Sequence, residues 1–354
     1  MKPPGPTEAG LRLRIADPLA EHDAAATAAR LPGAGIFHTQ AWARTLDAAY
    51  GFRTRLFLAE TAGGALAAAA AVTAVQNWPR GLRGVSQPFA DECPIVHRDT
   101  AARDFLYRAI GRHAVTSGWR HWELRGAGAP PGTAAATVFH GHEFPLDSAD
   151  RDCPAAAAPC VHRAVRLAMR AGVAVALDAG ESALRRFHAL YCRTRRRHGA
   201  PPAPWAFFAA LGRELISPGH GFVALATRGG EDLAGAVFLL HEGRAHYKYG
   251  ASDPERHHLR PNHLVMARSA AWCARQGCTT LDLGRTSLGA AGLRRYKLSW
   301  GAAERPVTYT RLHSRSGRQL HAADPAGAWP STVLRRLPLP LLRALGAWLH
   351  PRFT

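Results

Sequence analysis

The chain has only three lysines, and two of them lie in segments whose residues could take part in chemistry. Lysine occurs at Lys2, Lys248 and Lys297, so arginine accounts for 42 of the 45 lysine and arginine residues. Lys297 stands three residues before Trp300. A fixed cation of this kind stabilises the negative charge that builds on a carbonyl oxygen when an amine attacks it. The alternative is that the Lys297 stem only packs beside Tyr296 and Trp300.

An acid and an arginine stand together at the end of a predicted strand. The segment Gly277–Arg285 is typical of a strand that enters a glycine-containing loop, the place where α/β sheets present functional groups. Asp282 could act as a general base or could orient Arg285. Orientation is favoured, because an arginine lowers the pKa of a neighbouring carboxyl and makes it a poor base.

A second candidate lies in the predicted strand Arg244–Gly250. Strand alternation predicts that Arg244, His246 and Lys248 share one face, with Tyr247 and Tyr249 on the other. Lys248 could then bind a phosphate or carboxylate of a substrate. The alternative is an exposed strand with ordinary polar alternation.

An arginine-rich helix is predicted between Asp178, as N-cap, and Gly199, as the stop. Its buried stripe is predicted to contain Leu184, Phe187, Leu190 and Tyr191. The opposing face carries Arg197 with other arginines, and guanidinium groups suit phosphate oxygens. A solvated basic face is the alternative.

The elements that position these residues occur twice along the chain. Residues 221–227 and 233–240 predict a β-hairpin, and residues 56–60 and 65–75 repeat it. Downstream, each half has a predicted helix (104–116 and 263–276), followed by a strand that begins near a glycine and ends in an acid and an arginine. This repetition predicts an α/β fold with mixed sheets in two halves.

The predicted domains are 1–150, a linker at 151–165, a second domain at 166–315 and a basic tail at 316–354. Within the tail, residues 326–354 interleave leucine and tryptophan with arginine on both sides of Pro338 and Pro340. Two short amphipathic helices of this kind could lie on an anionic membrane or dock on the protein's own core.

The amino-acid composition restricts the class of protein to which the chain can belong. With 47% apolar residues, 20% charged residues and a net charge of +19, the chain is typical of a basic globular protein rather than a disordered or acidic one. No apolar run reaches membrane-spanning length, and residues 1–23 lack a signal-type segment, so we expect a cytoplasmic location.

Cysteine and histidine spacings do not indicate a metal site. The six cysteines form no CxxC pair, and we expect free thiols. His140, His142, Cys153, Cys160 and His162 match no standard zinc spacing, so no metal is predicted. The sequence also lacks the GxGxxG, Walker A, HExxH and GxSxG motifs, which argues against dinucleotide, nucleotide-hydrolysing and serine hydrolase chemistry.

Five segments, in order, carry a resemblance to a known group. They are Arg195–Pro202 (RRRHGAPP), Tyr247–Ser252 (YKYGAS), Pro261–Asn262, Asp282–Arg285 (DLGR) and Tyr296–Gly301 (YKLSWG). Over roughly residues 35–315, the chain resembles FemAB-like proteins of the GNAT acyltransferase superfamily, and most closely a branch associated with exopolysaccharide and exosortase loci.

The resemblance implies two tandem GNAT-like domains and assigns roles to the matching residues. Lys297, Asp282 and Arg285 are the implied catalytic residues. The implied substrate-binding residues are Arg196, Arg197, His198, Lys248, Tyr249, Asn262 and Tyr296.

The implied reaction moves an acyl or aminoacyl group onto an amine of an anionic cell-envelope or exopolysaccharide precursor. No cofactor is expected to stay bound, and the donor is aminoacyl-tRNA or acyl-CoA. The pyrophosphate loop of ordinary acetyl-CoA enzymes has no good copy here, which weakens acyl-CoA as the donor. One alternative is an N-acyltransferase that uses acyl-CoA or acyl carrier protein on a small amine. Another is a non-catalytic, membrane-associated scaffold in polysaccharide assembly. In any of these cases, residues 326–354 could make peripheral contact with the inner membrane.

Overall fold

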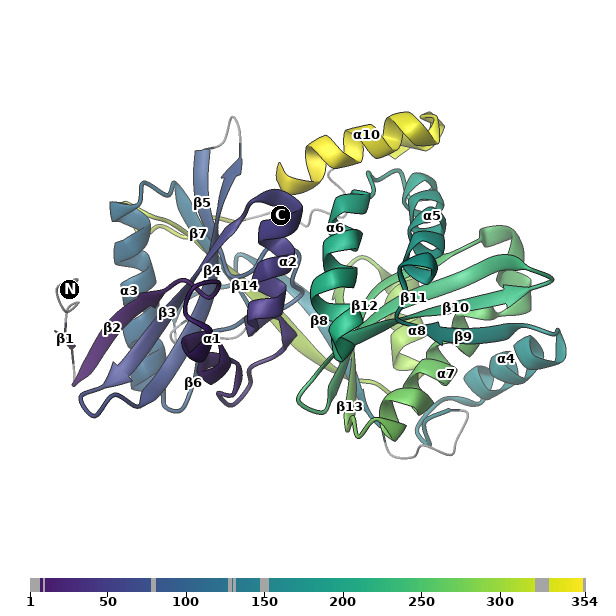
Figure 1. Ribbon diagram of the computed structural model, residues 1–354, viewed down its shortest axis with the longest axis horizontal. Coiled ribbons are helices and arrows are strands. Elements are labelled where there is room, and N and C mark those ends of the chain that lie inside the picture. The colour runs from purple at the N-terminus through teal and green to yellow at the C-terminus, as the bar shows by residue number, and fades with distance from the viewer. Residues whose placement is uncertain are drawn as a thin grey trace. The chain divides into compact units, whose positions relative to one another are not determined.

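The computed structural model describes residues 7–8, 10–77, 81–126, 129, 132–146, 153–321 and 331–352. The chain forms two compact α/β units (Figure 1). Residues 1–138, 307–324 and 351–354 make up the first unit, and residues 139–306 and 325–350 make up the second. Segments from the later part of the chain therefore belong to both units.

The sheet of the first unit is antiparallel except for one parallel pair. In order across the sheet, its strands are β1 (Thr7–Glu8), β2 (Leu11–Ala16), β3 (Arg53–Thr61), β4 (Leu66–Asn77), β5 (Gly81–Val85), β7 (His121–Arg125) and β14 (Ala303–His313). The parallel pair joins β5 to β7, and the short strand β6 (Val96–His97) pairs with β4. The helices are α1 (His22–Ala29), α2 (Gln40–Tyr50) and α3 (Thr100–Thr116). Apolar residues of α3, including Phe105 and Ile110, form a core with Phe57 of β3.

The second unit repeats this arrangement. In order across its sheet, the strands are β8 (Thr137–Pro145), β13 (Thr280–Ser287), β12 (Arg244–Ser252), β11 (Glu231–His241), β10 (Gly221–Arg228) and β9 (Ala174–Asp178). Here β12 and β13 are the parallel pair. The order β2-β3-β4-β5-β7 thus corresponds to β9-β10-β11-β12-β13. The predicted repeat and the mixed α/β class are confirmed.

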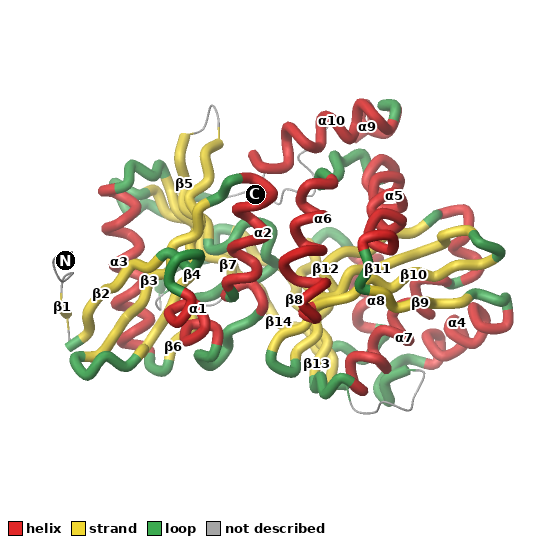
Figure 2. The backbone as a smooth tube through the Cα atoms, viewed as in Figure 1, coloured by secondary structure: helices red, strands yellow, loops and turns green. Residues whose placement is uncertain are grey.

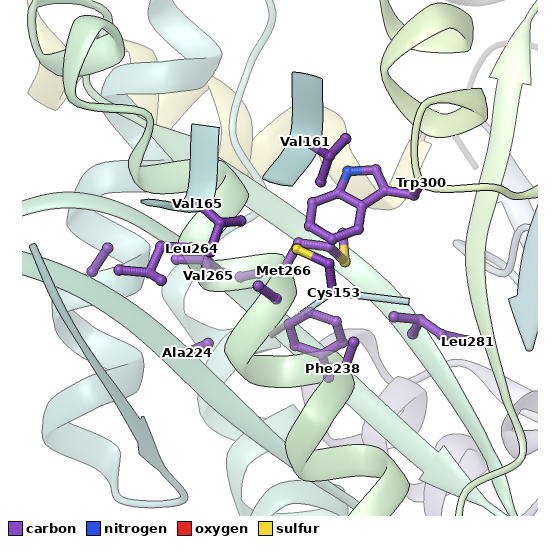
Figure 3. Packing of buried hydrophobic residues seen from close by; sticks show 14 of the residues in the cluster. Cys153, Val161, Val165, Ala224, Phe238, Leu264, Val265, Met266, Leu281 and Trp300 are labelled. Carbon is purple, nitrogen blue, oxygen red and sulfur yellow. The ribbon is translucent and has the colours of Figure 1, made fainter. Parts of the chain in front are cut away.

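Helices cover both faces of the second sheet (Figure 2). They are α4 (Pro159–Arg170), α5 (Glu181–Arg197), α6 (Trp205–Leu211), α7 (Pro261–Arg275) and α8 (Ala291–Leu298). On one face, Val161 and Val165 of α4 pack with Leu264 of α7, Phe238 of β11 and Trp300 (Figure 3). On the other face lie α5 and α6. The buried stripe predicted for α5 is confirmed at Leu184, Phe187, Leu190 and Tyr191. The segment predicted as a linker is described from Cys153 onward, and α4 begins within it.

A bulge in β12 corrects the predicted alternation of its side chains. Tyr249 lies opposite Val237, but Tyr247 lies opposite Phe238, so Lys248 is an extra residue on its strand. An extra residue reverses the side on which the following residues point. Tyr247 therefore packs in the core with Phe238, whereas Tyr249 packs against α6, and the prediction that the two tyrosines share a face is wrong.

The start of α5 also differs from the prediction. Its N-cap is Gly180, and Asp178 ends β9. The Asp178 carboxylate accepts a hydrogen bond from the Gly180 amide at 2.6 Å, so it orders the turn before the helix rather than its first turn.

Residues 331–349 of the basic tail form two helices of the second unit. They are α9 (Ser331–Arg336) and α10 (Leu339–Leu349). Leu342, Gly346 and Leu349 are the buried residues of α10. A β-carbon on Gly346 would come within 2.3 Å of the Pro202 carbonyl oxygen, so the helix packs closely on the segment before α6. Of the two alternatives for the tail, docking on the protein's own core is observed for these residues.

Candidate active site

The parallel strands β12 and β13 are paired only at one end. Their register runs from Arg244 opposite Thr280 to His246 opposite Asp282. Beyond this point β12 stays paired with β11, and β13 pairs with β8. Ligands of α/β sheets bind where adjacent strands part in this way. We therefore expect a ligand-binding site where β12 parts from β13.

A cavity of about 370 Å³ lies beside this half of β12, at the start of α7. Its lining residues come from α5, β12, the turn before α7, α7 itself and α8. They are Thr194, Arg197, His198, Tyr247, Gly250, Ala251, Ser252, His257, Arg260, Pro261, Asn262, His263, Leu293 and Tyr296. Four of the predicted substrate-binding residues are brought together here: Arg197, His198, Asn262 and Tyr296. We call this space the α7 cavity.

Two arginines supply the fixed positive charge of the α7 cavity. Arg197 comes from the last turn of α5, and Arg260 precedes α7 in the left-handed conformation, with φ of 57°. None of the described lining residues is acidic. Nη1 of Arg197 is buried and has no hydrogen-bond partner among the described residues. Because a buried guanidinium nitrogen without an acceptor is unfavourable, an anionic group bound here would stabilise it.

Two phenols add hydrogen-bond donors that do not ionise at neutral pH. Burial raises the pKa of Tyr247 to about 12 and raises that of Tyr296 as well. Tyr247 leans along β12 over Gly250, the residue whose lack of a side chain leaves room for the phenol. Both hydroxyls therefore remain protonated and able to donate to an oxygen atom in the α7 cavity.

Three imidazoles in the lining are kept neutral by burial and by the arginines. Burial, and then the charge of Arg260, lowers the pKa of His263 to about 4. Burial, and then Arg197, lowers the pKa values of His257 and His198. A neutral imidazole can accept a proton, whereas a protonated one cannot.

One of these imidazoles is paired with a hydroxyl. The Oγ of Ser252 lies 2.8 Å from Nε2 of His257. The backbone of Ser252 is fixed in turn by Thr194, whose hydroxyl donates to the Ser252 carbonyl oxygen at 3.1 Å. Ser252 ends β12 and His257 lies in the turn Pro254–Leu259 that follows, so the pair gives the α7 cavity a hydroxyl that can pass a proton to a nitrogen.

Lys297 lies outside the lining and is buried beneath β13, only 3% exposed. Its ammonium donates hydrogen bonds to the carbonyl oxygens of Gly284 at 2.8 Å and Arg285 at 3.1 Å. These carbonyls follow the point where β13 leaves β12, and the register of β13 with β8 also shifts there. Lys297 therefore holds the backbone of the irregular part of β13.

The structure places Asp282 and Arg285 in the same irregular segment. Asp282 accepts a hydrogen bond from the Gly284 amide at 2.7 Å and lies 3.2 Å from Nδ1 of His246. Gly284 has a φ of 69°, which a residue with a side chain rarely adopts. The guanidinium of Arg285 stacks 4.2 Å from the ring centre of Phe139. Asp282 thus fixes the backbone turn of this loop.

The remaining predicted residues do not line the α7 cavity. Lys248 is the bulge residue of β12, with its ammonium 5.3 Å from the ring centre of Tyr249. Tyr249 packs against Tyr191, Phe207 and Phe208. Arg196 is half-buried near the end of α5. In the described part of the chain, no group of three or more histidine, cysteine or acidic side chains could hold a metal ion.

Sequence reasoning missed several lining residues: Thr194, Tyr247, Ser252, His257, Arg260 and His263. The run His257-His-Leu-Arg-Pro-Asn-His263 contained a signal, because three histidines and an arginine surround the proline that starts a helix. Tyr247 was missed because the bulge was not predicted.

Comparisons with known proteins agree with this arrangement. Residues 161–298 match the model of a family described as an acetyltransferase (GNAT) domain. The second unit is similar to a GNAT domain. The sequence has no significant match among curated proteins.

Solved structures extend the similarity to most of the chain. The crystal structure of FemX has a TM-score of 0.64 at 15% identity, covering 82% of this chain and 95% of that one. A structure of L-PGS from Bacillus licheniformis has a TM-score of 0.54 at 12% identity, covering 98% of this chain and 100% of that one. A tandem GNAT protein from the clavulanic acid biosynthesis pathway has a TM-score of 0.51 at 10% identity, covering 86% of this chain and 100% of that one. At these identities the similarity establishes the fold: two GNAT-like units in tandem.

Proposed function

We propose that the chain transfers an acyl or aminoacyl group to an amine of an anionic cell-envelope or exopolysaccharide precursor, and that the reaction takes place at the α7 cavity. The observation that carries the proposal is the lining of the cavity. Arg197 and Arg260 provide fixed positive charge without an acidic residue among the described lining, in a unit whose sequence matches a GNAT domain. Phosphate or diphosphate is the chemical group that best suits two guanidiniums.

In the proposed reaction, the amine nitrogen attacks the carbonyl carbon of the activated acyl group. A C–N bond forms, and the C–O bond of an ester or the C–S bond of a thioester breaks. The amine loses one proton, and the departing oxygen or sulfur gains one. Negative charge builds on the carbonyl oxygen, and the hydroxyls of Tyr247 and Tyr296 are placed to donate to it.

We assign the transfer of the amine proton to Ser252 and His257. In the tautomer with hydrogen on Nδ1, Nε2 of His257 accepts the Ser252 hydroxyl proton across 2.8 Å, and Ser252 takes the proton of the amine. Replacing His257 with glutamine is then expected to lower kcat/KM by about 10²-fold and to flatten its fall at acidic pH. A pH profile unchanged by this substitution would show that the proton leaves by another route.

Lys297, Asp282 and Arg285 enter the proposal as residues that hold β13 beside the cavity. Lys297 binds two backbone carbonyls, and Asp282 fixes the Gly284 turn. That Lys297 itself stabilises the oxyanion stays a prediction. So does contact of Arg196, Lys248 and Tyr249 with substrate, for which the α7 cavity gives no support.

The test is a transfer assay with the purified full-length chain, a radiolabelled donor and an amino-sugar acceptor that carries a diphosphate. We expect Arg197→Gln and Arg260→Gln each to raise KM for the anionic substrate about tenfold, because each removes a charged hydrogen bond. Arg193→Gln is the matched control, since Arg193 is exposed on α5 outside the lining. Equal KM values in all three variants would contradict the site, and no transfer from any donor would favour the scaffold alternative.

A second candidate keeps the site and takes acyl-CoA as its donor. The match of residues 161–298 to an acetyltransferase family favours it. Native mass spectrometry of the chain purified from its own host separates the two donors: a bound mass equal to coenzyme A supports the thioester, and co-purifying tRNA supports the aminoacyl ester. Competition of each compound in the transfer assay provides the confirming measurement.

A further inference from the structure

The tail helix α10 is apolar almost all the way round, although it lies on the surface of the second unit. Its only charged residue is Arg343. Leu342 and Leu349 are buried against the unit, while Leu341 is 59% exposed and Trp348 is 56% exposed. A helix with apolar residues on both faces is covered on both faces in its working environment. Contact with the second unit accounts for the apolar residues on the buried face of α10, but not for those on its outer face.

The exposed apolar surface continues into α9. Val333 is 62% exposed there, and Leu337 is half-buried between the helices. We call the outer side of these two helices, with Val333, Leu341 and Trp348, the tail surface. In the second unit, α10 lies beside α5 and α6 (Figure 1). A ring contact of 5.9 Å between His350 and Phe207 of α6 fixes its end.

Positive charge borders the tail surface. Arg335, Arg336 and Arg343 are exposed, and the described stretch 331–352 contains no aspartate or glutamate. A water-exposed tryptophan and leucine flanked by arginines form the pattern of a segment that lies in the interface of an anionic bilayer. In the described part of the chain, no helix is long and apolar enough to cross a membrane. Binding along the surface is the mode that remains for this pattern.

The tail surface also adjoins the α7 cavity. The charge of Arg335 is among the causes, after burial, that lower the pKa of His198, which lines the cavity. In addition, α9 packs against α5, whose last turn supplies Arg197 to the cavity lining.

We propose that the tail surface binds an anionic phospholipid membrane, with Leu341 and Trp348 entering the interface and Arg335 and Arg336 contacting lipid phosphates. This binding places the rim of the α7 cavity beside the bilayer. It would give an acceptor that is carried on a lipid phosphate a short route to the two arginines of the cavity. The surface itself requires neither donor nor acceptor, so its test is independent of the proposed transfer reaction.

The experiment is co-sedimentation of the full chain with vesicles. We expect binding to phosphatidylglycerol mixed with phosphatidylcholine, no binding to phosphatidylcholine alone, and weaker binding as salt is raised. The variant Leu341→Ser/Trp348→Ser is expected to lower the partition coefficient at least about tenfold. Arg335→Gln/Arg336→Gln is expected to lower it about fivefold for each charge.

Matched controls are available on α4, which packs on the opposite face of the sheet. Leu167 is a 43% exposed leucine, and Arg163 and Arg166 are exposed arginines. Leu167→Ser and Arg163→Gln/Arg166→Gln test whether any exposed leucine or arginine pair has the same effect. Because all these side chains are exposed, thermal unfolding is expected to show every variant folded.

Two results would overturn the proposal. One is vesicle binding that Leu341→Ser/Trp348→Ser leaves unchanged or that the α4 controls reduce equally. The other is sedimentation equilibrium showing a dimer that this variant dissociates, which would assign the tail surface to a second copy of the chain.

Discussion

The hydroxyl of Tyr247 occupies the space beside Gly250 that a side chain at position 250 would fill. A β-carbon on Gly250 would come within 1.7 Å of the Tyr247 hydroxyl oxygen and 2.8 Å of its Cζ atom. Gly250 is not in the left-handed region, so the position requires glycine for space and not for its backbone conformation. The bulge at Lys248 brings these two residues onto one face of β12.

Gly250→Ala is expected to displace the Tyr247 phenol from the α7 cavity. The overlap predicts a loss of about 1–3 kcal/mol in the free energy of unfolding, together with weaker ligand binding. Urea unfolding measures the first effect. Gly35→Ala is the control, because nothing lies within 4 Å of its β-carbon position. Adding Tyr247→Phe to Gly250→Ala should restore part of the stability, and no restoration would show that the overlap is not the cause.

The two lysines of the body give a matched pair for a test of β13. Lys297→Met is expected to lower the free energy of unfolding by about 2–4 kcal/mol, since it removes two charged hydrogen bonds and leaves the Gly284 and Arg285 carbonyls without their donor. Lys248→Met, at a half-buried bulge, is expected to change it by less than about 1 kcal/mol. Similar losses in both variants would contradict the supporting role of Lys297.

A buried ion-pair cluster stabilises the first unit. Glu123 is 2% exposed and accepts hydrogen bonds from Arg125 at 2.8 Å and from Arg311 at 2.9 Å. Glu123→Gln is expected to cost about 3–5 kcal/mol, because it leaves two guanidiniums without their carboxylate. Glu181→Gln, which breaks an exposed pair with Arg185, is the control and should cost less than about 1 kcal/mol.

The same carboxyl predicts how acid acts on this unit. Burial opposes ionisation of Glu123, but Arg125 and Arg311 outweigh burial and hold its pKa at about 2, below its ordinary value of 4.5. The unfolded chain therefore takes up a proton at a higher pH than the folded one. The stability from this group is present above about pH 4.5 and is lost as pH falls toward 2. In Glu123→Gln the loss of stability over this range should be smaller.

His263 predicts a second pH effect, in the second unit. Burial and the charge of Arg260 lower its pKa from 6.5 to about 4. Between these values the unfolded state binds a proton that the folded state does not, so stability should fall as pH drops from about 6.5 to 4. Urea unfolding at several pH values measures the slope. His263→Phe should reduce it and keep the ring contact with Tyr296.

Much of the fold could be predicted from local pattern. The hairpin at residues 221–227 and 233–240 and its copy in the first half were visible because apolar runs and glycine turns are local properties. The bulge at Lys248 was not, because it depends on how β12 pairs with β11. One extra residue moved Tyr247 into the core and toward the α7 cavity.

The candidate site was predicted in part for the same reason. Arg197, His198, Asn262 and Tyr296 lie in motifs of characteristic sequence, and the structure brings all four to one cavity. Lys248 and Lys297 attracted attention because lysine is rare in this chain. Neither lysine lines the cavity, because the low frequency of a residue type does not determine where its side chain points. Lys248 is the bulge residue of β12, and the Lys297 ammonium binds a backbone carbonyl of β13.

The sequence by itself determined the two α/β halves, the basic character of the chain and the segments that carry the family resemblance, since these follow from composition, periodicity and short motifs. Only the tertiary structure decided which residues face the α7 cavity and which support it. The reason is that a cavity exists where β12 and β13 part, and this parting depends on pairings between strands far apart in the sequence. The tail follows the same rule: its pattern predicted amphipathic helices, and packing decided that Leu342 is buried while Leu341 and Trp348 face outward.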